Sequence, residues 1–277
     1  MTISVNTNAS ALIALQNLNK TNDNLSGVQN RISTGLKVAN AKDDASVWAI
    51  AQGQRAENMS LQAIKSSLDR GQSIADVAMT AGAQISDLLN QIKAKVTAQL
   101  EPNLDSTSRA ALNNDFKALL RQVANVVTNA TFDGANILNG SLTANMRFLA
   151  NADATSFVTL SAKNMSLGGA LVTIASTATM STATAANTLF GLVDASIVNV
   201  NLALGDIGAQ ARTIEAHNTF VSKLGDVLET GIGHLVDADM ARESARLQAL
   251  QVQQQLGAQA LSIANSGPQV ILSLFRN

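Results

Sequence analysis

Histidine, cysteine and clustered carboxylates are the side chains with which a protein most often binds metals or moves protons. The chain has two histidines, His217 and His234, and no cysteine. Neither histidine stands in a spacing typical of metal ligands, such as H-E-x-x-H. Without cysteine, the chain has no disulfide, no thiolate nucleophile and no thiolate metal site. We therefore expect structural or surface positions for both histidines.

Two pairs of aspartates are the remaining candidates for chemistry. Asp43 and Asp44 would suit acid–base catalysis, and Asp237 and Asp239 would suit the start of a calcium loop. Each pair stands near the start of a predicted helix, where a carboxylate accepts hydrogen bonds from free backbone N–H groups. No further acidic residues follow at the spacing of a calcium loop. We therefore expect helix capping, no catalytic, cofactor-binding or metal site, and a protein that is not an enzyme.

Composition disfavours several classes of partner. The net charge is −1 and charged residues are 14% of the chain, so no basic excess is available to neutralise nucleic-acid phosphates. No stretch approaches the roughly 20 uninterrupted apolar residues of a membrane span, so we expect no membrane insertion. Residues 1–8 lack the basic and apolar regions of a cleaved signal peptide. Aromatic residues are only 3%, which disfavours a pocket lined by aromatic rings.

Apolar residues instead repeat at alternating spacings of three and four residues, the heptad pattern of helices that pack along their length. One such stretch begins at Ala11 and ends near Gly35, a candidate helix stop. The next stretch is the most regular, and Pro102 marks its end. Its predicted buried positions are Leu61, Ile64, Leu68, Gly71, Ala75, Ala78, Gly82, Ile85, Leu89, Ile92 and Val96.

Three further helical stretches are predicted. One begins near 106–108, where serine or threonine can cap it. Another begins near Ala186 and is expected to be interrupted at Gly231 and Gly233. The last is expected to bend or end at 267–268, a Gly-Pro pair.

The middle of the chain, roughly 131–182, lacks the heptad pattern. Residues 146–150 and 155–160 alternate weakly between apolar and polar types, which predicts a β-hairpin across 151–154. Residues 177–184 are small, polar and uncharged, and should lie on the surface. The predicted fold class is mainly α, a long antiparallel helical bundle or coiled coil formed by the N- and C-terminal halves, with a small β-hairpin insert.

Both ends of the chain closely resemble those of bacterial flagellins. The long segment RISTGLKVANAKDDA at 31–45 carries the resemblance at the N-terminal end, after residues 3–8. FDG and ILNG at 132–140 resemble the flagellin passage into its β-hairpin. VDADMA at 236–241 and the segment 260–276 carry it at the C-terminal end. The resemblance is to a short flagellin without large outer domains, similar to those of some alphaproteobacteria.

The resemblance implies an architecture in layers. Residues 1–44 and 234–277 are expected to form an inner coiled-coil layer, and 45–130 and 186–233 the helices of a second layer. Residues 131–185 are expected to hold the β-hairpin and a Ser/Thr-rich surface segment. The implied function is a structural subunit that polymerises into the flagellar filament for swimming motility. A hook–filament junction protein and a surface carbohydrate-binding flagellin homologue remain alternatives.

The resemblance also implies partners and a location. Copies of the chain in a helical filament are the main partners, with the filament cap, the hook–filament junction proteins and a flagellar export chaperone. Export through the flagellar type III channel would place the chain outside the cell. The expected self-assembly residues are Leu12, Leu15, Leu18, Leu25, Ile32, Leu247, Leu250, Leu261, Ile271, Leu272 and Phe275. Flagellins often carry O-linked glycans, and the candidate sites are Thr177, Thr179, Ser181, Thr182 and Thr184, with a plain polar linker as the alternative.

Overall fold

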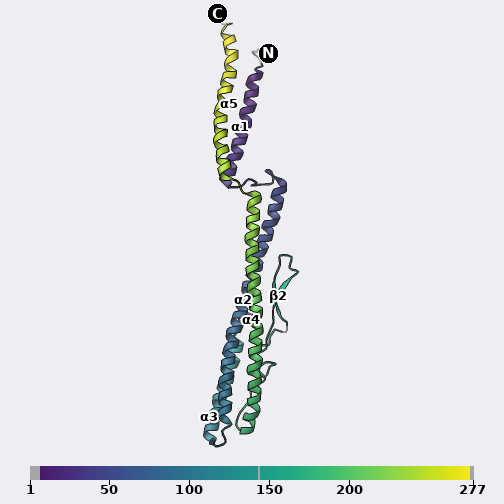
Figure 1. Ribbon diagram of the computed structural model, residues 1–277, viewed down its shortest axis with the longest axis vertical. Helices are drawn as coiled ribbons and strands as arrows, with labels where there is room; N and C mark the ends of the chain where they lie inside the picture. Colours follow the sequence, from purple (N-terminus) through teal and green to yellow (C-terminus); the bar gives the residue numbers. More distant parts are fainter. Residues whose placement is uncertain (1–6, 143, 275–277) are drawn as a thin grey trace. The chain divides into compact units, whose positions relative to one another are not determined.

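A computed structural model describes residues 7–142 and 144–274 of the chain. Over those residues the protein consists of long helices and one small sheet (Figure 1). The chain divides into two compact units. The terminal unit comprises Met1–Ala56 and Val227–Asn277, and the central unit comprises Glu57–Asp226. The elements are α1 (Ala9–Thr34), α2 (Ala45–Gln99), α3 (Ser106–Asn129), β1 (Met146–Leu149), β2 (Phe157–Leu160), α4 (Ala183–Val236) and α5 (Met240–Leu274).

Helices in both units pair in antiparallel fashion, which confirms the predicted mainly-α fold class. In the terminal unit, Nδ2 of Asn8 donates to the backbone oxygen of Ala264 over 2.7 Å, so the start of α1 lies beside the C-terminal part of α5. In the central unit, Oγ of Ser86 donates to Oδ1 of Asn201 over 2.9 Å, and Lys93 pairs with Asp194. Higher numbers in α2 therefore lie beside lower numbers in α4.

The predicted apolar seam of α2 forms much of the core of the central unit. All eleven of its predicted positions are buried. The two glycines among them are needed for close approach. A Cβ on Gly71 would lie 3.0 Å from the ring of Phe148, and a Cβ on Gly82 would overlap the side chain of Leu204. Small residues thus let β1 and α4 approach the backbone of α2 closely.

The hairpin confirms the strand prediction, with slightly shorter strands. β1 and β2 are antiparallel, with Met146 opposite Leu160. Oδ1 of Asn151 accepts hydrogen bonds from the backbone N–H groups of Thr155 and Ser156, which closes the turn. Nε2 of His217, in α4, lies 2.7 Å from the backbone oxygen of Ala150. The histidine therefore has the structural position that the sequence predicts.

Several predicted helix boundaries are wrong. α4 begins at Ala183 and continues through Gly231 and Gly233 to Val236. A glycine costs only about 1 kcal/mol in a helix interior, and burial of Ile232 and Val236 outweighs that cost. α5 continues past residues 267–268 to Leu274, so the predicted end at this Gly-Pro pair is wrong and the predicted bend is the alternative that remains.

The residue that caps α3 also differs from the prediction. Asp105 is the N-cap, and its Oδ1 accepts a hydrogen bond from the backbone N–H of Ser108 over 2.7 Å. The predicted capping residues, 106–108, are instead the first turn of the helix. A carboxylate is an equally good cap and also favours the helix dipole.

α4 is unusually apolar for a helix of a folded unit. By length and composition it contains a window that could cross a membrane, and 28% of that window is buried. The core helix of a folded protein meets the same criterion, and here one face of α4 packs in the central unit through Val193, Val200 and Ile207. Much of its remaining apolar surface is open.

Candidate assembly surface of the terminal helices

The helices α1 and α5 lie side by side in the terminal unit (Figure 1). Asn8 caps α1, and its Oδ1 accepts a hydrogen bond from the backbone N–H of Ala11 over 3.0 Å. α1 ends where Gly35 takes a left-handed conformation with φ of 72°, as the sequence predicts for this glycine. Both ends of α1 are therefore fixed by its own sequence.

One heptad seam on each helix forms the contact. In α1 the buried and half-buried seam positions are Ala11, Ala14, Leu18, Thr21, Leu25, Val28 and Ile32. In α5 they are Glu243, Leu247, Leu250, Gln254, Gly257, Leu261 and Ala264. Leu25, Val28 and Leu250 are the buried centre, and Ile32 and Leu247 pack against them. Spacings of three and four residues on both helices are those of coiled-coil packing.

One polar contact and one close approach connect the two helices farther along the pair. Nε2 of Gln254 donates to Oδ1 of Asn22 over 2.8 Å. A Cβ on Gly257 would lie 3.2 Å from Cδ1 of Leu18, so the helices approach closely there. Asn22 is exposed and lies beside the seam, so this polar contact borders the apolar packing.

The predicted self-assembly residues divide between two environments. Leu18, Leu25, Ile32, Leu247, Leu250 and Leu261 lie in the seam between α1 and α5 of the same chain. Leu12 and Leu15 lie outside it and are 53% and 41% exposed. Phe275 lies outside the described residues, as do the side chains of Ile271 and Leu272.

A second apolar stripe runs along the open side of α5, and sequence reasoning missed it. Its largest members, Val252, Leu256 and Ile263, are 55%, 58% and 72% exposed. Exposed alanines at 245, 249 and 260 continue the stripe at spacings of three and four residues. We call residues 245, 249, 252, 256, 260 and 263 the α5 outer stripe. The signal was present in the sequence as a second heptad register beside the first.

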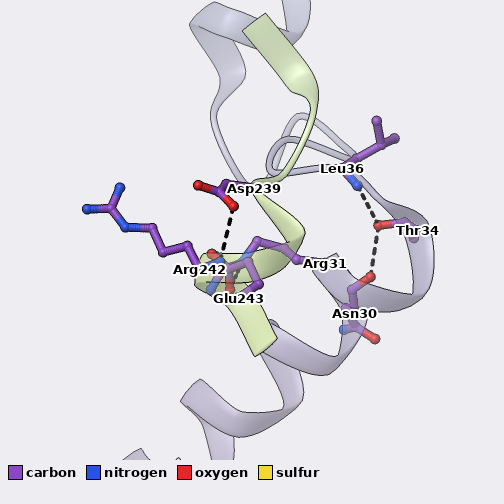
Figure 2. Close-up of polar contacts among 7 residues, drawn as sticks. All are labelled: Asn30, Arg31, Thr34, Leu36, Asp239, Arg242 and Glu243. Atoms are coloured by element: carbon purple, nitrogen blue, oxygen red, sulfur yellow. Dashed lines mark hydrogen bonds and ion pairs between the residues drawn. The ribbon is translucent and has the colours of Figure 1, made fainter. Parts of the chain in front are cut away.

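An ion pair joins the last turn of α1 to the first turn of α5 (Figure 2). Nε of Arg31 donates to Oε2 of Glu243 over 3.2 Å, and the carboxylate side chain is only 11% exposed. At the end of α1, Oγ1 of Thr34 donates to the backbone oxygen of Asn30 and accepts from the backbone N–H of Leu36. These contacts fix the chain where it leaves α1.

The segment after α1 pairs with the segment before α5. The backbone N–H of Lys37 donates to the oxygen of Val236 over 2.6 Å, and that of Ala238 donates to the oxygen of Gly35 over 2.9 Å. Beside this pairing, Val38 and Val236 are buried, and Trp48 packs against them. The side chain of Trp48 is partly buried at this contact.

Of the four candidate aspartates, Asp44 and Asp239 act as helix caps, as predicted. Asp43 does not, because its Oδ2 accepts hydrogen bonds from the N–H groups of Ala39 and Asn40 in the segment before α2. Oδ1 of Asp44 accepts hydrogen bonds from the N–H groups of Ser46 and Val47 at the start of α2. Oδ1 of Asp239 accepts hydrogen bonds from the N–H groups of Ala241 and Arg242 at the start of α5 (Figure 2). Both carboxylates therefore satisfy backbone donors that the helix leaves free.

His234, Asp237 and Asp239 surround a small polar hollow of about 390 Å³. Among the described residues, no group of three or more His, Cys, Asp or Glu side chains is arranged to hold a metal ion. The engagement of Asp239 with backbone N–H groups removes one of the oxygens that a cation would need.

The candidate glycosylation residues Thr177, Thr179, Ser181, Thr182 and Thr184 are all exposed. Between them, Met180 is buried, and its backbone N–H donates to Oδ1 of Asn113 over 2.9 Å. Nε2 of Gln99 donates to the backbone oxygen of Met180 over 2.6 Å. The surface prediction is thus confirmed for these hydroxyl groups, and one methionine anchors the segment.

Comparisons with known proteins agree with this architecture. Residues 5–143 match the bacterial flagellin N-terminal helical region, and residues 190–275 match the bacterial flagellin C-terminal helical region. Flagellin FljJ of Caulobacter vibrioides is 52% identical over 276 residues, which cover 100% of this chain and 99% of the relative. A flagellin of Brucella melitensis is 37% identical and is covered to 99%.

A solved structure shares the fold. The crystal structure of Bacillus cereus flagellin aligns with a TM-score of 0.50 and 14% sequence identity, covering 56% of this chain and 88% of that one. The family matches span both helical ends, and the relatives span the full length of the chain. The chain therefore belongs to the bacterial flagellin family.

Proposed function

We propose that this chain is a repeating structural subunit of the bacterial flagellar filament, with a role in swimming motility, and that its terminal unit carries a surface on which copies pack. Membership of the flagellin family supports the filament role. The observation that carries the packing surface is the α5 outer stripe, in which Val252, Leu256 and Ile263 are all more than half exposed. A continuous exposed apolar stripe on a helix is typical of a surface that another helix covers.

The predicted assembly residues have two roles in this proposal. The seam residues, represented by Leu25, Ile32 and Leu250, hold α1 against α5 and so present the outer stripe. Leu12 and Leu15, together with the outer stripe, contact neighbouring copies. Covering one large apolar side chain contributes about 1.5–3 kcal/mol, and the filament repeats each burial at every subunit. Contacts between different surfaces of identical chains do not close, so they generate a helical filament.

We also propose a layered arrangement, which membership of the flagellin family supports. We assign residues 1–44 and 234–277 to the inner layer and residues 45–130 and 186–233 to the second layer. Residues 131–185 are assigned to the surface, because they hold the hairpin and the exposed hydroxyl groups.

Location and partners follow the filament role. The family implies an extracellular filament subunit, and we assign export to the flagellar type III channel with the help of an export chaperone. The filament cap and the hook–filament junction proteins are the other partners we assign, and we assign no nucleic acid, no membrane insertion, no cofactor and no enzymatic activity.

A surface carbohydrate-binding role finds no support in the open groove of about 510 Å³ between α2 and α3, because none of its lining residues is aromatic. A hook–filament junction role is the other alternative, and the abundance of the chain in purified filaments tests it.

O-glycosylation of residues 177–184 is a separate proposal. The exposed hydroxyl groups support it, although Oγ1 of Thr182 also accepts a hydrogen bond from the N–H of Ala185 at the start of α4. Thr177, Thr179, Ser181 and Thr184 are therefore the favoured acceptors. The mass of the intact chain from its native filament, measured by mass spectrometry, should exceed the bare mass of 28.8 kDa. A measured mass equal to the bare chain would contradict glycosylation and favour a plain linker.

The filament proposal is tested by seeded polymerisation of the purified chain, followed by electron microscopy. The wild-type chain should elongate the seeds into filaments. The variant Leu256→Glu should raise the critical concentration at least tenfold, because it places a charge in the outer stripe. The matched control is Gln255→Glu, which adds a charge at an exposed neighbour outside the stripe and should polymerise normally.

The two outcomes that contradict the proposal differ. A wild-type chain that never elongates seeds contradicts the filament role. Equal critical concentrations for Leu256→Glu and Gln255→Glu contradict the role of the outer stripe. Because Leu256 is 58% exposed, its substitution should leave the helical content of the monomer unchanged by circular dichroism.

A further inference from the structure

The central unit has an open apolar stripe of its own, on α4. Val198, Leu202 and Phe220 are 53%, 69% and 58% exposed. The stripe also includes Leu192, and exposed small residues at 195, 205, 209 and 216 complete it. We call this set the α4 outer stripe. From 192 to 209 its members follow spacings of three and four residues, on a different face from the buried positions Val193, Val200 and Ile207. The exposed Arg212 takes the next position at this spacing, and 216 and Phe220 lie beyond it.

The stripe explains the composition of α4. The helix has a window apolar enough for a membrane span, yet only 28% of that window is buried. The uncharged row from Leu192 to Ala209 covers about half of this face of α4 before Arg212 interrupts it. An exposed apolar row of this length is unusual on the surface of a protein that acts alone.

The same unit holds an apolar groove between α2 and α3. Its volume is about 510 Å³. Val77, Ala81, Val126 and Ala130 are its buried and half-buried lining residues. Five exposed polar residues surround them, namely Asp76, Thr80, Gln84, Asn125 and Asn129. An apolar base with a polar rim is typical of a site that receives apolar side chains.

We propose that the α4 outer stripe of one copy docks in the α2–α3 groove of a neighbouring copy in the filament. This proposal rests on the proposed filament function and names the contact that the central units make. An assembly of identical chains that does not close needs two different, complementary surfaces on each chain. The stripe and the groove are such a pair, because one projects large apolar side chains and the other has an apolar base.

Charge also favours a second copy as the occupant. The one charged residue that lines the groove is Asp76, and Arg212 follows the uncharged part of the stripe on α4. Opposite charges beside two apolar surfaces suppress wrong pairings and fix the register. The contact need not be strong, because the terminal units already hold neighbouring copies at a high effective concentration.

Cysteine cross-linking tests the contact without background, because the natural chain has no cysteine. The double variant Leu202→Cys, Val126→Cys is copolymerised with an equal amount of wild-type chain, checked for filaments by electron microscopy, and then oxidised. Covalent dimers and higher oligomers should appear on a denaturing gel. Each single variant should remain monomeric. The control is Leu202→Cys with Met59→Cys, which joins the stripe to an exposed residue that does not line the groove and should give no oligomers.

Filaments that contain the double variant but give no covalent oligomers would overturn the proposed contact and leave the filament function intact. Dimers from Leu202→Cys alone would also overturn it, since the stripe would then meet itself. A wild-type chain that forms no filaments would instead contradict the filament function.

If the double variant is excluded from filaments, a second measurement decides. Leu202→Glu and Met59→Glu each replace an exposed apolar residue of the central unit by a charge. The proposal expects the critical concentration to rise at least tenfold for Leu202→Glu and less than twofold for Met59→Glu. Equal effects would overturn it.

Discussion

Arg31 and Glu243 stand 212 residues apart in the chain, and their side chains meet at 3.2 Å where α1 ends and α5 begins. Arg31→Met would leave the carboxylate of Glu243, which is 11% exposed, without its partner. We expect a loss of about 2 kcal/mol in the stability of the α1–α5 pair, because an uncompensated buried charge is costly. Guanidinium unfolding of the monomer, followed by circular dichroism, measures this loss.

The double variant Arg31→Met, Glu243→Met separates the charge from the packing. With both charges removed, most of the lost stability should return, since a buried ion pair is about as stable as a well-packed apolar pair. Equal losses in the single and double variants would show that the side-chain stems, rather than the ion pair, hold this end of the helices together.

Gly257 supplies a second prediction about the same helix pair. A Cβ at this position would lie 3.2 Å from Cδ1 of Leu18, whereas a Cβ on Gly27 would meet nothing within 4 Å. Gly257→Leu should therefore destabilise the pair by about 1–3 kcal/mol through overpacking. Gly27→Leu should stabilise α1 by up to about 1 kcal/mol, because leucine favours helix more than glycine does. Thermal unfolding followed by circular dichroism measures the melting temperature of each variant against that of the wild-type monomer. Melting temperatures that change in the same direction in both variants would contradict the close approach at Gly257.

Asp206 gives the central unit a contribution to stability that depends on pH. Hydrogen bonds from Lys163 and then from Gln210 lower the pKa of this aspartate. Because the folded-state pKa is the lower one, the stabilisation is fully present above the pKa of an unfolded aspartate, about 3.9, and is lost as the pH falls through the folded-state value. The side chain of Asp206 is 46% exposed, so solvent screening keeps the contribution small.

Lys163→Met should raise the pKa of Asp206 towards its ordinary value, and carboxyl-carbon NMR titration measures that change directly. Lys223→Met removes the same charge from an exposed position on α4 and should leave the pKa unchanged. An unchanged pKa in Lys163→Met would assign the effect to Gln210 instead.

Periodicity accounts for what could be predicted from the sequence. The three-and-four spacing from Leu61 to Val96 predicted every buried position along that row of α2, because a helix that packs along its length must keep one face apolar. The hairpin between residues 146 and 160 was equally visible, since its apolar residues alternate around a turn. Both signals are local and are repeated several times, so single exceptions do not hide them.

Other features depend on information that periodicity does not contain. α5 carries two apolar registers, and spacing alone does not say that Leu250 faces α1 while Leu256 faces outward. The pairing of Arg31 with Glu243 joins residues from opposite ends of the chain. The predicted helix interruption at Gly231 is wrong. The helix-propensity cost of a glycine, about 1 kcal/mol, is smaller than the free energy gained by burying neighbouring residues such as Ile232.

Removal of residues 262–277 tests how independent the two units are. The truncation deletes Ala264, whose backbone oxygen accepts a hydrogen bond from Nδ2 of Asn8, and Ile263 of the outer stripe. The central unit keeps its whole core, because Leu61, Phe116 and Val221 all lie within 57–226. We therefore expect a soluble chain with a cooperative thermal transition that does not elongate filament seeds. Normal filaments from this truncation would show that assembly depends on the central units and would remove the terminal helices from the role assigned to them.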